Sequence, residues 1–257
     1  MSADFYYAHK IIKMKKVLII SDNLQLCLRT LPIFEEYSHE FEFDYSISPF
    51  SDKKQFNEKL LGAVKVFDLR LEADVNLIIK HYSLVISIHC KQLFPESLIT
   101  NIRCINIHPG YNPINRGWYP QIFSIINDSE IGATIHEIDE DIDHGNIIAR
   151  SFVKKEMVDT SKSLYDKILE KEIELLRDNI EAILFNTYIT IVPEDEGNLY
   201  LKRDFKELCK LNLEEKLTML EAINRLRALS HGELNNAYFI DPDTGQKIFV
   251  TLNLKYS

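Results

Sequence analysis

Two short segments of this 257-residue chain hold side chains whose types and spacing suit acid–base chemistry. Residues 104–121 read CINIHPGYNPINRGWYPQ, and residues 132–150 read GATIHEIDEDIDHGNIIAR. In the first segment, Asn106 and His108 stand two positions apart at the end of a predicted strand, so their side chains lie on the same face. The Pro-Gly pair that follows ends the strand. These two residues are therefore candidates for acting together.

An amide next to an imidazole at a strand end suits one kind of catalysis. Open parallel sheets bind their ligands beyond the carboxyl ends of their strands. At such a place Asn106 can donate a hydrogen bond to a developing oxyanion, and His108 can transfer a proton. The alternative without a catalytic role is a polar strand end, in which the Asn106 side chain forms a hydrogen bond to the turn. This segment alone leaves both interpretations open.

The carboxylates of the second segment raise the question of a calcium site. Asp139, Asp141 and Asp143 have the spacing of a calcium-binding loop. However, the sixth position is His144 where glycine is needed, and the twelfth is Arg150 where a bidentate glutamate is needed. We therefore expect no calcium there. The acids either face water or form a binding loop in which Asp143, just before a His-Gly turn, has a separate role.

Zinc and a serine nucleophile are also not expected. Neighbouring strands can bring together several potential zinc ligands, namely His89, Cys90, Cys104, His108 and His144. The dense Cys and His spacing of zinc sites is missing, however, and buried free cysteine is common core material. The chain also has no G-x-S-x-G nucleophile elbow. We predict a site without metal.

The elements that must position these segments alternate in type along the first part of the chain. Apolar or alternating runs predict strands at 16–20, 41–46, 63–69, 84–88 and 104–107. Helices are predicted between them at 24–37, 53–61 and 74–82. Strands that alternate with helices predict an α/β domain with a mostly parallel sheet and flanking helices.

The remaining elements differ from this pattern. The acidic loop is flanked by predicted strands at 132–138 and 146–153, which are expected to pair antiparallel. Thr160 and Ser161 can cap a long helix that begins near Ser163 and ends near Leu184.

A polar connector, PEDEGN at 193–198, then leads to a smaller C-terminal α+β unit. That unit is predicted to contain a helix at 213–229 and a final β-hairpin at 237–256 around a Pro-Asp-Thr-Gly turn. We divide the chain into an N-terminal extension at 1–13, a catalytic domain at 14–190 and a C-terminal domain at 191–257.

Composition excludes several classes of function. The chain has 30 Lys and Arg against 39 Asp and Glu, a formal charge of −9, which argues against nucleic-acid binding. Its 8 glycines form neither a G-x-G-x-x-G fingerprint nor a P-loop. No apolar run has the length of a membrane span or a secretory signal. The 4 scattered cysteines are typical of reduced thiols in the cytoplasm.

The motifs NIHPG, PINRG and GATIH followed by IDHG resemble the formyltransferases that use N10-formyltetrahydrofolate. By this resemblance Asn106, His108 and Asp143 match the catalytic Asn, His and Asp of the family. The segments HCKQLFP, NPINRGWYPQIFSI and RALSHGELNNAYF further resemble its sugar N-formyltransferase branch. The transfer-RNA branch departs here, because residues 193–257 are too few and too little charged for its basic C-terminal domain.

The resemblance implies a Rossmann-like fold, N10-formyltetrahydrofolate as the formyl donor, and a dTDP-linked amino sugar as the acceptor. The sugar is expected to be dTDP-4-amino-4,6-dideoxyglucose, and the alternatives are a dTDP-3-amino-3,6-dideoxyhexose or a non-catalytic binding module. The implied donor-binding residues are His89, Cys90, Lys91, Gln92, Asp139, Glu140, Asp141 and Ile142. The implied acceptor-binding residues are Lys91, Tyr111, Asn115, Arg116, Trp118 and Tyr119.

The C-terminal hairpin also has an implied role in assembly. Its second strand carries Phe249, Val250, Leu252 and Leu254, and an exposed apolar edge invites pairing. Sugar formyltransferases that resemble this chain dimerise through the same region, so we expect a homodimer. The resemblance further implies a cytoplasmic enzyme of cell-surface polysaccharide synthesis, such as O-antigen synthesis.

Overall fold

The computed structural model describes residues 14–60 and 64–257. The predicted extension at 1–13, the last residue of the helix predicted at 53–61 and the first residue of the strand predicted at 63–69 lie outside these residues. Within the described residues, no helix is both long enough and apolar enough to cross a membrane.

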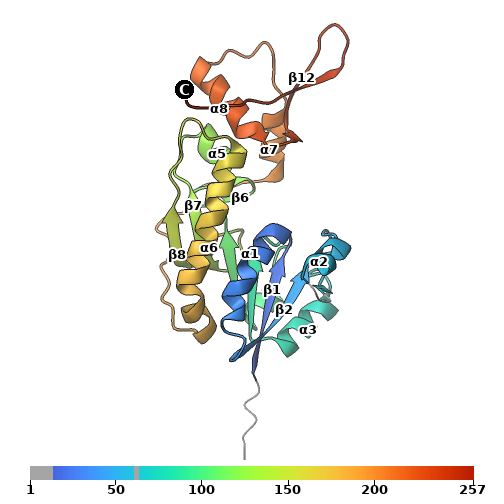
Figure 1. The fold of residues 1–257 in the computed structure, drawn as a ribbon, viewed down its shortest axis with the longest axis vertical. Helices are drawn as coiled ribbons and strands as arrows, with labels where there is room; N and C mark the ends of the chain where they lie inside the picture. Colours follow the sequence, from blue (N-terminus) through green and yellow to red (C-terminus); the bar gives the residue numbers. More distant parts are fainter. Residues whose placement is uncertain (1–13, 61–63) are drawn as a thin grey trace, which may run out of the picture.

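A seven-stranded sheet lies at the centre of the larger part of the molecule (Figure 1). Its order is β3-β2-β1-β4-β5-β7-β8. The strands are β1 (Lys15–Ser21), β2 (Phe41–Ile47), β3 (Lys65–Val66), β4 (Leu84–Ile88), β5 (Arg103–His108), β7 (Gly132–Glu137) and β8 (Ile147–Phe152). The first five pair in parallel, whereas β7 pairs antiparallel with both β5 and β8. The prediction of a mostly parallel Rossmann-like sheet is confirmed.

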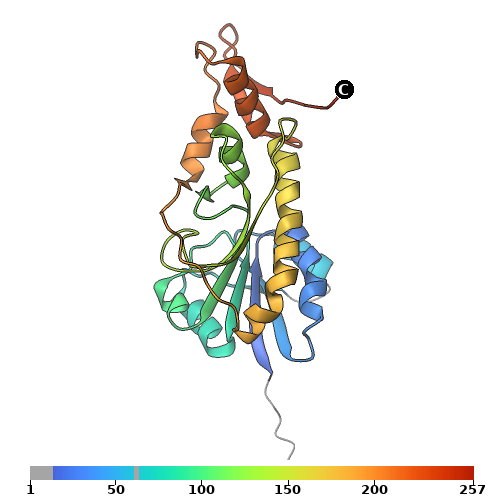
Figure 2. The same ribbon diagram turned by 90° about the vertical axis from the view of Figure 1, so that its left-hand side faces the viewer.

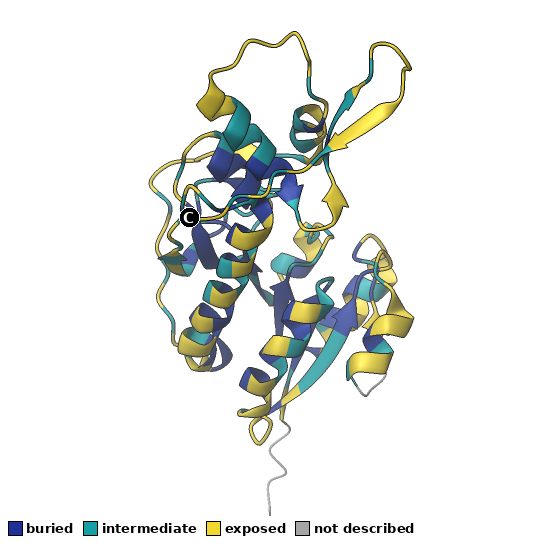
Figure 3. Ribbon diagram, turned by 45° about the horizontal axis from the view of Figure 1, so that its top comes forward, coloured by how far each residue is buried: buried dark blue, intermediate teal, exposed yellow. Residues whose placement is uncertain are grey.

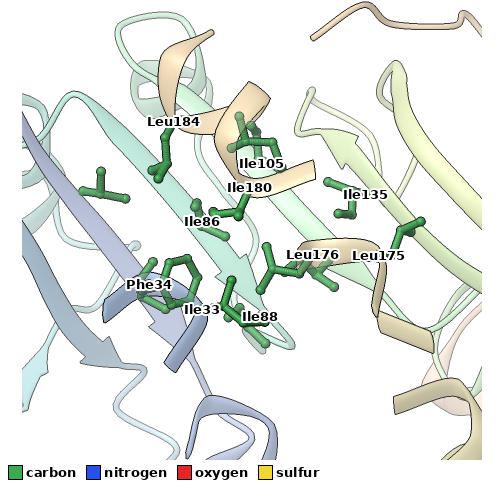
Figure 4. Close-up of a cluster of buried hydrophobic side chains, with 14 of the residues drawn as sticks. Ile33, Phe34, Ile86, Ile88, Ile105, Ile135, Leu175, Leu176, Ile180 and Leu184 are labelled. Atoms are coloured by element: carbon green, nitrogen blue, oxygen red, sulfur yellow. The ribbon is translucent and has the colours of Figure 1, made fainter. Parts of the chain in front are cut away.

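Helices cover both faces of this sheet because the central strands are apolar on both sides. Val17 and Ile19 of β1 belong to a core cluster with α1 (Leu24–Glu35) and α6 (Ser161–Phe185), part of which Figure 4 shows. Leu18 and Ile20 point to the opposite face and belong to a cluster with α3 (Glu72–His81) and α4 (Glu96–Ile99). A further helix, α2 (Lys53–Leu60), packs beside β2 through Phe56.

The long helix α6 links the sheet to the C-terminal unit (Figure 2). Thr160 is its N-cap and accepts a hydrogen bond from the backbone of Ser163, while the Ser163 hydroxyl bonds back to the Thr160 N–H. This capping box places the start at Ser161, two residues before the predicted start. The helix ends where Asn186 adopts a left-handed conformation, with φ of 59°.

The C-terminal unit contains the small helices α7 (Lys202–Cys209) and α8 (Met219–Leu229) and four short strands. The strands are β10 (Ser230–His231), β11 (Leu234–Asn235), β12 (Ala237–Ile240) and β13 (Lys247–Val250). The predicted hairpin is present as the antiparallel pair β12–β13, and most of it is exposed (Figure 3). The helix predicted at 213–229 is wrong in its first part, because Thr218 and Glu221 form a capping box that starts α8 at Met219.

The C-terminal unit is anchored to the larger domain by a buried cation. The side chain of Arg227, on α8, is only 2% exposed and donates hydrogen bonds to the backbone oxygens of Glu156 and Asp159, both at 2.9 Å. Ala228 packs into one apolar cluster with Leu164 of α6 and with α5 (Pro120–Ile126). These contacts hold β10, which follows α8 directly, next to the N-terminus of α6.

The polar segment predicted as a connector packs against the larger domain. The short strands β6 (Arg116–Gly117) and β9 (Leu199–Tyr200) pair in parallel. The Arg116 N–H donates to Asn198 and the Trp118 N–H donates to Tyr200, each at 2.8 Å. Residues 198–200 therefore hold in place the loop that follows β5. The domain boundary at 190 and 191 stays a prediction.

Candidate active site

A cavity of about 750 Å³ opens beyond the carboxyl ends of β1, β4 and β5. Residues of both chemistry-bearing segments line it, among them Asn106, His108 and Asp143. This is where a parallel sheet is expected to bind a ligand. The predicted loop residues His89, Cys90, Lys91 and Gln92 line it as well, as do Asp139, Glu140, Asp141 and Ile142.

The carboxylate of Asp143 is the centre of the polar network in this cavity. Its Oδ1 accepts a hydrogen bond from Asn106 Nδ2 at 3.1 Å, and its Oδ2 accepts one from the Gly117 N–H at 3.1 Å. The same Oδ2 lies 3.4 Å from His108 Nδ1. The structure thus brings together the three residues that the motifs singled out, although Asp143 is 35 residues or more away from the other two in the sequence.

Burial and charge set the ionisation of this group. Burial lowers the pKa of His108 to about 4, against the opposing attraction of Asp143. Burial alone would raise the pKa of Asp143, but His108, His136 and the Gly117 amide together hold it well below its usual range. At neutral pH the site therefore holds a neutral imidazole next to an ionised carboxylate. Such a pair can accept a proton and stabilise the resulting imidazolium.

The sequence analysis missed His136, which belongs to the same network. Its Nδ1 lies 2.6 Å from the Glu137 backbone oxygen and so carries the ring proton. Its Nε2 is then an acceptor for Asn106 Nδ2, at 3.2 Å. Asn106 and His136 are direct partners in the β5–β7 ladder. Only this antiparallel register places the two side chains together.

Gly110 packs closely against the catalytic candidate His108. A Cβ at position 110 would lie 2.4 Å from His108 Nε2 and 2.8 Å from its Cδ2, far inside van der Waals contact. The Nε2 atom is buried and has no hydrogen-bond partner among the described residues. The glycine of the N-x-H-P-G motif thus leaves room for the imidazole in its position opposite Asp143.

The loop after β4 is held by buried side chains. His89 adopts a left-handed backbone conformation with φ of 55°, and its Nε2 lies 2.8 Å from the fully buried carboxyl group of Glu172. Its Nδ1 lies 3.2 Å from the Tyr165 hydroxyl and 3.3 Å from Asn23 Nδ2. Burial raises the pKa of Glu172. This left-handed loop residue is held by two residues of α6 and by the N-cap of α1, so the loop forms a fixed wall of the cavity.

Other side chains of the two predicted binding loops are already engaged within the protein. Gln92 accepts from the Leu69 N–H and donates to the Phe67 oxygen, both at 2.9 Å. Asp139 lies 2.6 Å from His144 Nδ1, and this hydrogen bond raises the pKa of His144. The side chains of Gln92 and Asp139 are therefore less available to a ligand, whereas Lys91, Glu140 and Asp141 also line the cavity.

Three of the residues predicted to contact an acceptor do not line the cavity. Tyr111 stacks on Phe152, with ring centroids 3.8 Å apart. Asn115 is fully buried and donates to the Glu130 oxygen at 3.0 Å. Arg116 is buried behind the loop, where its Nη2 lies 3.6 Å from the exposed Glu196. Packing and internal hydrogen bonds engage these side chains outside the cavity, and their contact with an acceptor stays a prediction.

Trp118 and Tyr119 do line the cavity, as the sequence analysis expected, and so does Lys91. They are joined there by residues that were not among the predicted site residues, namely Asp22, Asn23, Gln121, Tyr165 and His231. These come from helix termini and from the C-terminal unit. Long-range packing brings these side chains to one cavity.

Two family profiles match this chain. The formyl transferase profile matches residues 11–180, and the profile described as the N-formyltransferase dimerization C-terminal domain matches residues 204–256. A curated relative from Mycobacterium bovis, named dTDP-4-amino-4,6-dideoxyglucose formyltransferase, is 48% identical over 178 residues. That match covers 69% of this chain and 76% of the relative.

Solved structures extend the similarity to both parts of the chain. A sugar N-formyltransferase from a Shewanella species is 40% identical, with a TM-score of 0.89 over 95% of this chain and 100% of that one. A 4-N formyltransferase from Francisella tularensis is 41% identical, with a TM-score of 0.87 over 95% of this chain and 99% of that one.

Proposed function

Because this chain belongs to the formyl transferase family, we propose that it transfers a formyl group from N10-formyltetrahydrofolate to a dTDP-linked amino sugar. The proposed acceptor is dTDP-4-amino-4,6-dideoxyglucose, the sugar in the name of the mycobacterial relative. The observation that carries the proposal is the convergence of Asn106, His108 and Asp143 on one cavity at the end of the sheet.

The proposed reaction is direct transfer without a covalent enzyme intermediate. The neutral amine attacks the formyl carbon, and the carbonyl electron pair moves onto oxygen. Asn106 donates a hydrogen bond to that oxygen. The His108–Asp143 pair takes up the proton that the amine nitrogen loses. When the carbon–N10 bond breaks, the electron pair returns to form the formamide carbonyl and the pair gives a proton to N10.

The two loops at the acidic end of the cavity are proposed to hold the formyl donor. Residues 89–92 and 139–142 both line the cavity. Because Gln92 and Asp139 have partners within the protein, backbone N–H and C=O groups are left to recognise the pteridine. Such groups are fixed donors and acceptors, which suits a planar heterocycle with both.

Assembly and location form part of the same proposal. A homodimer through the β12–β13 hairpin is supported by the dimerization profile over residues 204–256 and by Ile248 and Phe249, which are 40% and 46% exposed. A molar mass in solution equal to one chain would contradict it. A cytoplasmic enzyme is supported by four free cysteines, and a role in cell-surface polysaccharide synthesis follows from the proposed acceptor.

The proposed activity predicts a defined product. The protein, incubated with N10-formyltetrahydrofolate and dTDP-4-amino-4,6-dideoxyglucose, is expected to convert the sugar to its formamide, seen by mass spectrometry as the gain of one CO. A dTDP-3-amino-3,6-dideoxyhexose is the competing acceptor and a dTDP-sugar without an amine is the control. Preferential conversion of the 3-amino sugar would replace the proposed acceptor. Binding of the sugar without turnover would instead favour a non-catalytic binding module.

Gly110→Ala is expected to lower kcat/KM by up to about 100-fold, because the new Cβ must displace His108 from its position opposite Asp143. Steady-state kinetics of formyl transfer measure this. Gly245→Ala is the control: its φ of 68° strains the distant hairpin turn, but the new Cβ meets nothing within 4 Å, so stability can fall while the kinetics stay unchanged. Equal kinetics for Gly110→Ala and the wild type would show that formyl transfer does not require the His108 imidazole at this position.

A further inference from the structure

The C-terminal unit contributes one wall of the cavity. His231, in β10, lines the cavity together with Trp118, Tyr119 and Tyr165. The profile that matches this unit describes it only as a dimerization domain. Arg227 and the packing of α8 on α5 fix this unit next to α6. The unit is therefore placed to contact a ligand in the cavity as well as a second subunit.

His231 is held by one ring nitrogen and presents the other. Its Nδ1 lies 3.0 Å from the hydroxyl of Ser161, in the first turn of α6. Gln121 Nε2 donates to the same hydroxyl oxygen at 3.2 Å, which leaves the Ser161 hydrogen free for His231 Nδ1. The ring proton is then on Nε2, which has no hydrogen-bond partner among the residues that the structure describes. Nε2 is therefore a donor available to a ligand.

The charge near His231 differs from that of the acidic loop that also lines the cavity. The 139–143 loop presents four acids, which repel a phosphate. Two lysines lie beside residues of this wall. Lys202 Nζ lies 3.8 Å from the centre of the Trp118 ring, and Lys162, paired with Asp166, packs beside Gly232.

Aromatic faces, an unpartnered N–H and nearby cations together match one chemical class. Trp118 and Tyr119 can pack on a sugar or base, and an N–H donor next to lysines suits phosphate oxygens. Burial and the charge of Lys162 lower the pKa of His231, so the ring binds as a neutral donor. The diphosphate of a nucleotide-linked acceptor fits this wall of the cavity and does not fit the acidic loop.

The geometry points to His231 as a residue that binds the diphosphate of the acceptor, so that the C-terminal unit helps to select nucleotide-linked substrates. This inference rests on the proposed function, because it takes the acceptor to be a nucleotide sugar. It adds that a residue outside the formyl transferase profile determines acceptor affinity.

Calorimetry with thymidine diphosphate and thymidine as probes tests the inference. His231→Phe keeps an aromatic ring next to Tyr165 but removes the N–H. It is expected to weaken thymidine diphosphate binding about tenfold or more and to leave thymidine binding unchanged. His231→Gln, which places an amide N–H near the position of Nε2, is expected to restore part of the affinity. His81→Phe, at an exposed position on α3, is the matched control.

The outcomes separate this inference from the proposed function. If His231→Phe binds thymidine diphosphate as the wild type does, or if thymidine binding falls by the same factor, His231 does not contact the diphosphate. If His231→Gln restores nothing while its thermal unfolding matches the wild type, the role is one of packing only and the inference is wrong. If the wild type itself does not bind thymidine diphosphate, both the proposal of a nucleotide-linked acceptor and the inference about His231 are wrong.

Discussion

Asp143→Asn is expected to lower kcat/KM for formyl transfer by about 10²–10⁴-fold. The carboxylate of Asp143 is the one group that touches both other members of the catalytic group, through Asn106 Nδ2 and His108 Nδ1. Its negative charge raises the affinity of His108 for a proton. Without that charge the pKa of His108 falls further below 4, and the imidazole becomes a poorer proton acceptor in the transition state.

The amide that replaces the carboxylate in this variant would also disturb the hydrogen bonds at the site. Both Asn106 Nδ2 and the Gly117 N–H donate to Asp143, and an amide has only one accepting oxygen. One of these donors therefore loses its partner inside a buried site. The loss should appear in kcat and kcat/KM together, as for interactions made in the transition state.

The matched control for this prediction is Asp178→Asn, at an exposed position on α6. It removes the same charge far from the cavity and should leave the kinetics unchanged. Steady-state kinetics with saturating formyl donor measure both variants. If Asp143→Asn keeps more than about one tenth of the wild-type kcat, the carboxylate takes no part in proton transfer.

Site residues that local geometry positions could be predicted from the sequence, whereas those that long-range packing positions could not. Asn106 and His108 were found because a spacing of two on a strand fixes a shared face from local geometry alone. Asp143 was found through a motif, although its approach depends on the antiparallel return of β7 and β8. His231 lies in the RALSHGELNNAYF segment but was not predicted as a site residue, because only the packing of α8 on α5 and α6 brings it to the cavity.

Long-range contacts also separate residues that are neighbours in the sequence. Arg116 and Trp118 are two residues apart in one loop, yet only Trp118 lines the cavity, because the pairing of β6 with β9 turns Arg116 away. The amphipathic pattern that predicted a helix from residue 213 continues through the true start of α8. Leu217 and Leu220, which lie on the apolar side of that pattern, are 42% and 55% exposed. The capping box formed by Thr218 and Glu221 sets the start of α8, although the apolar pattern begins one turn earlier.

Asn106→Ala is expected to lower kcat by about 10²–10³-fold, the usual cost of losing one oxyanion donor. The acceptors His136 Nε2 and Asp143 Oδ1 lie 3.5 Å from each other and on the same side of Asn106 Nδ2, so one N–H serves both. The second N–H is then free, and we expect it to donate to the formyl oxygen. Asn101→Ala, in the exposed loop before β5, is the control. A raised KM with unchanged kcat would mean that Asn106 binds the substrate in the ground state and does not stabilise the oxyanion.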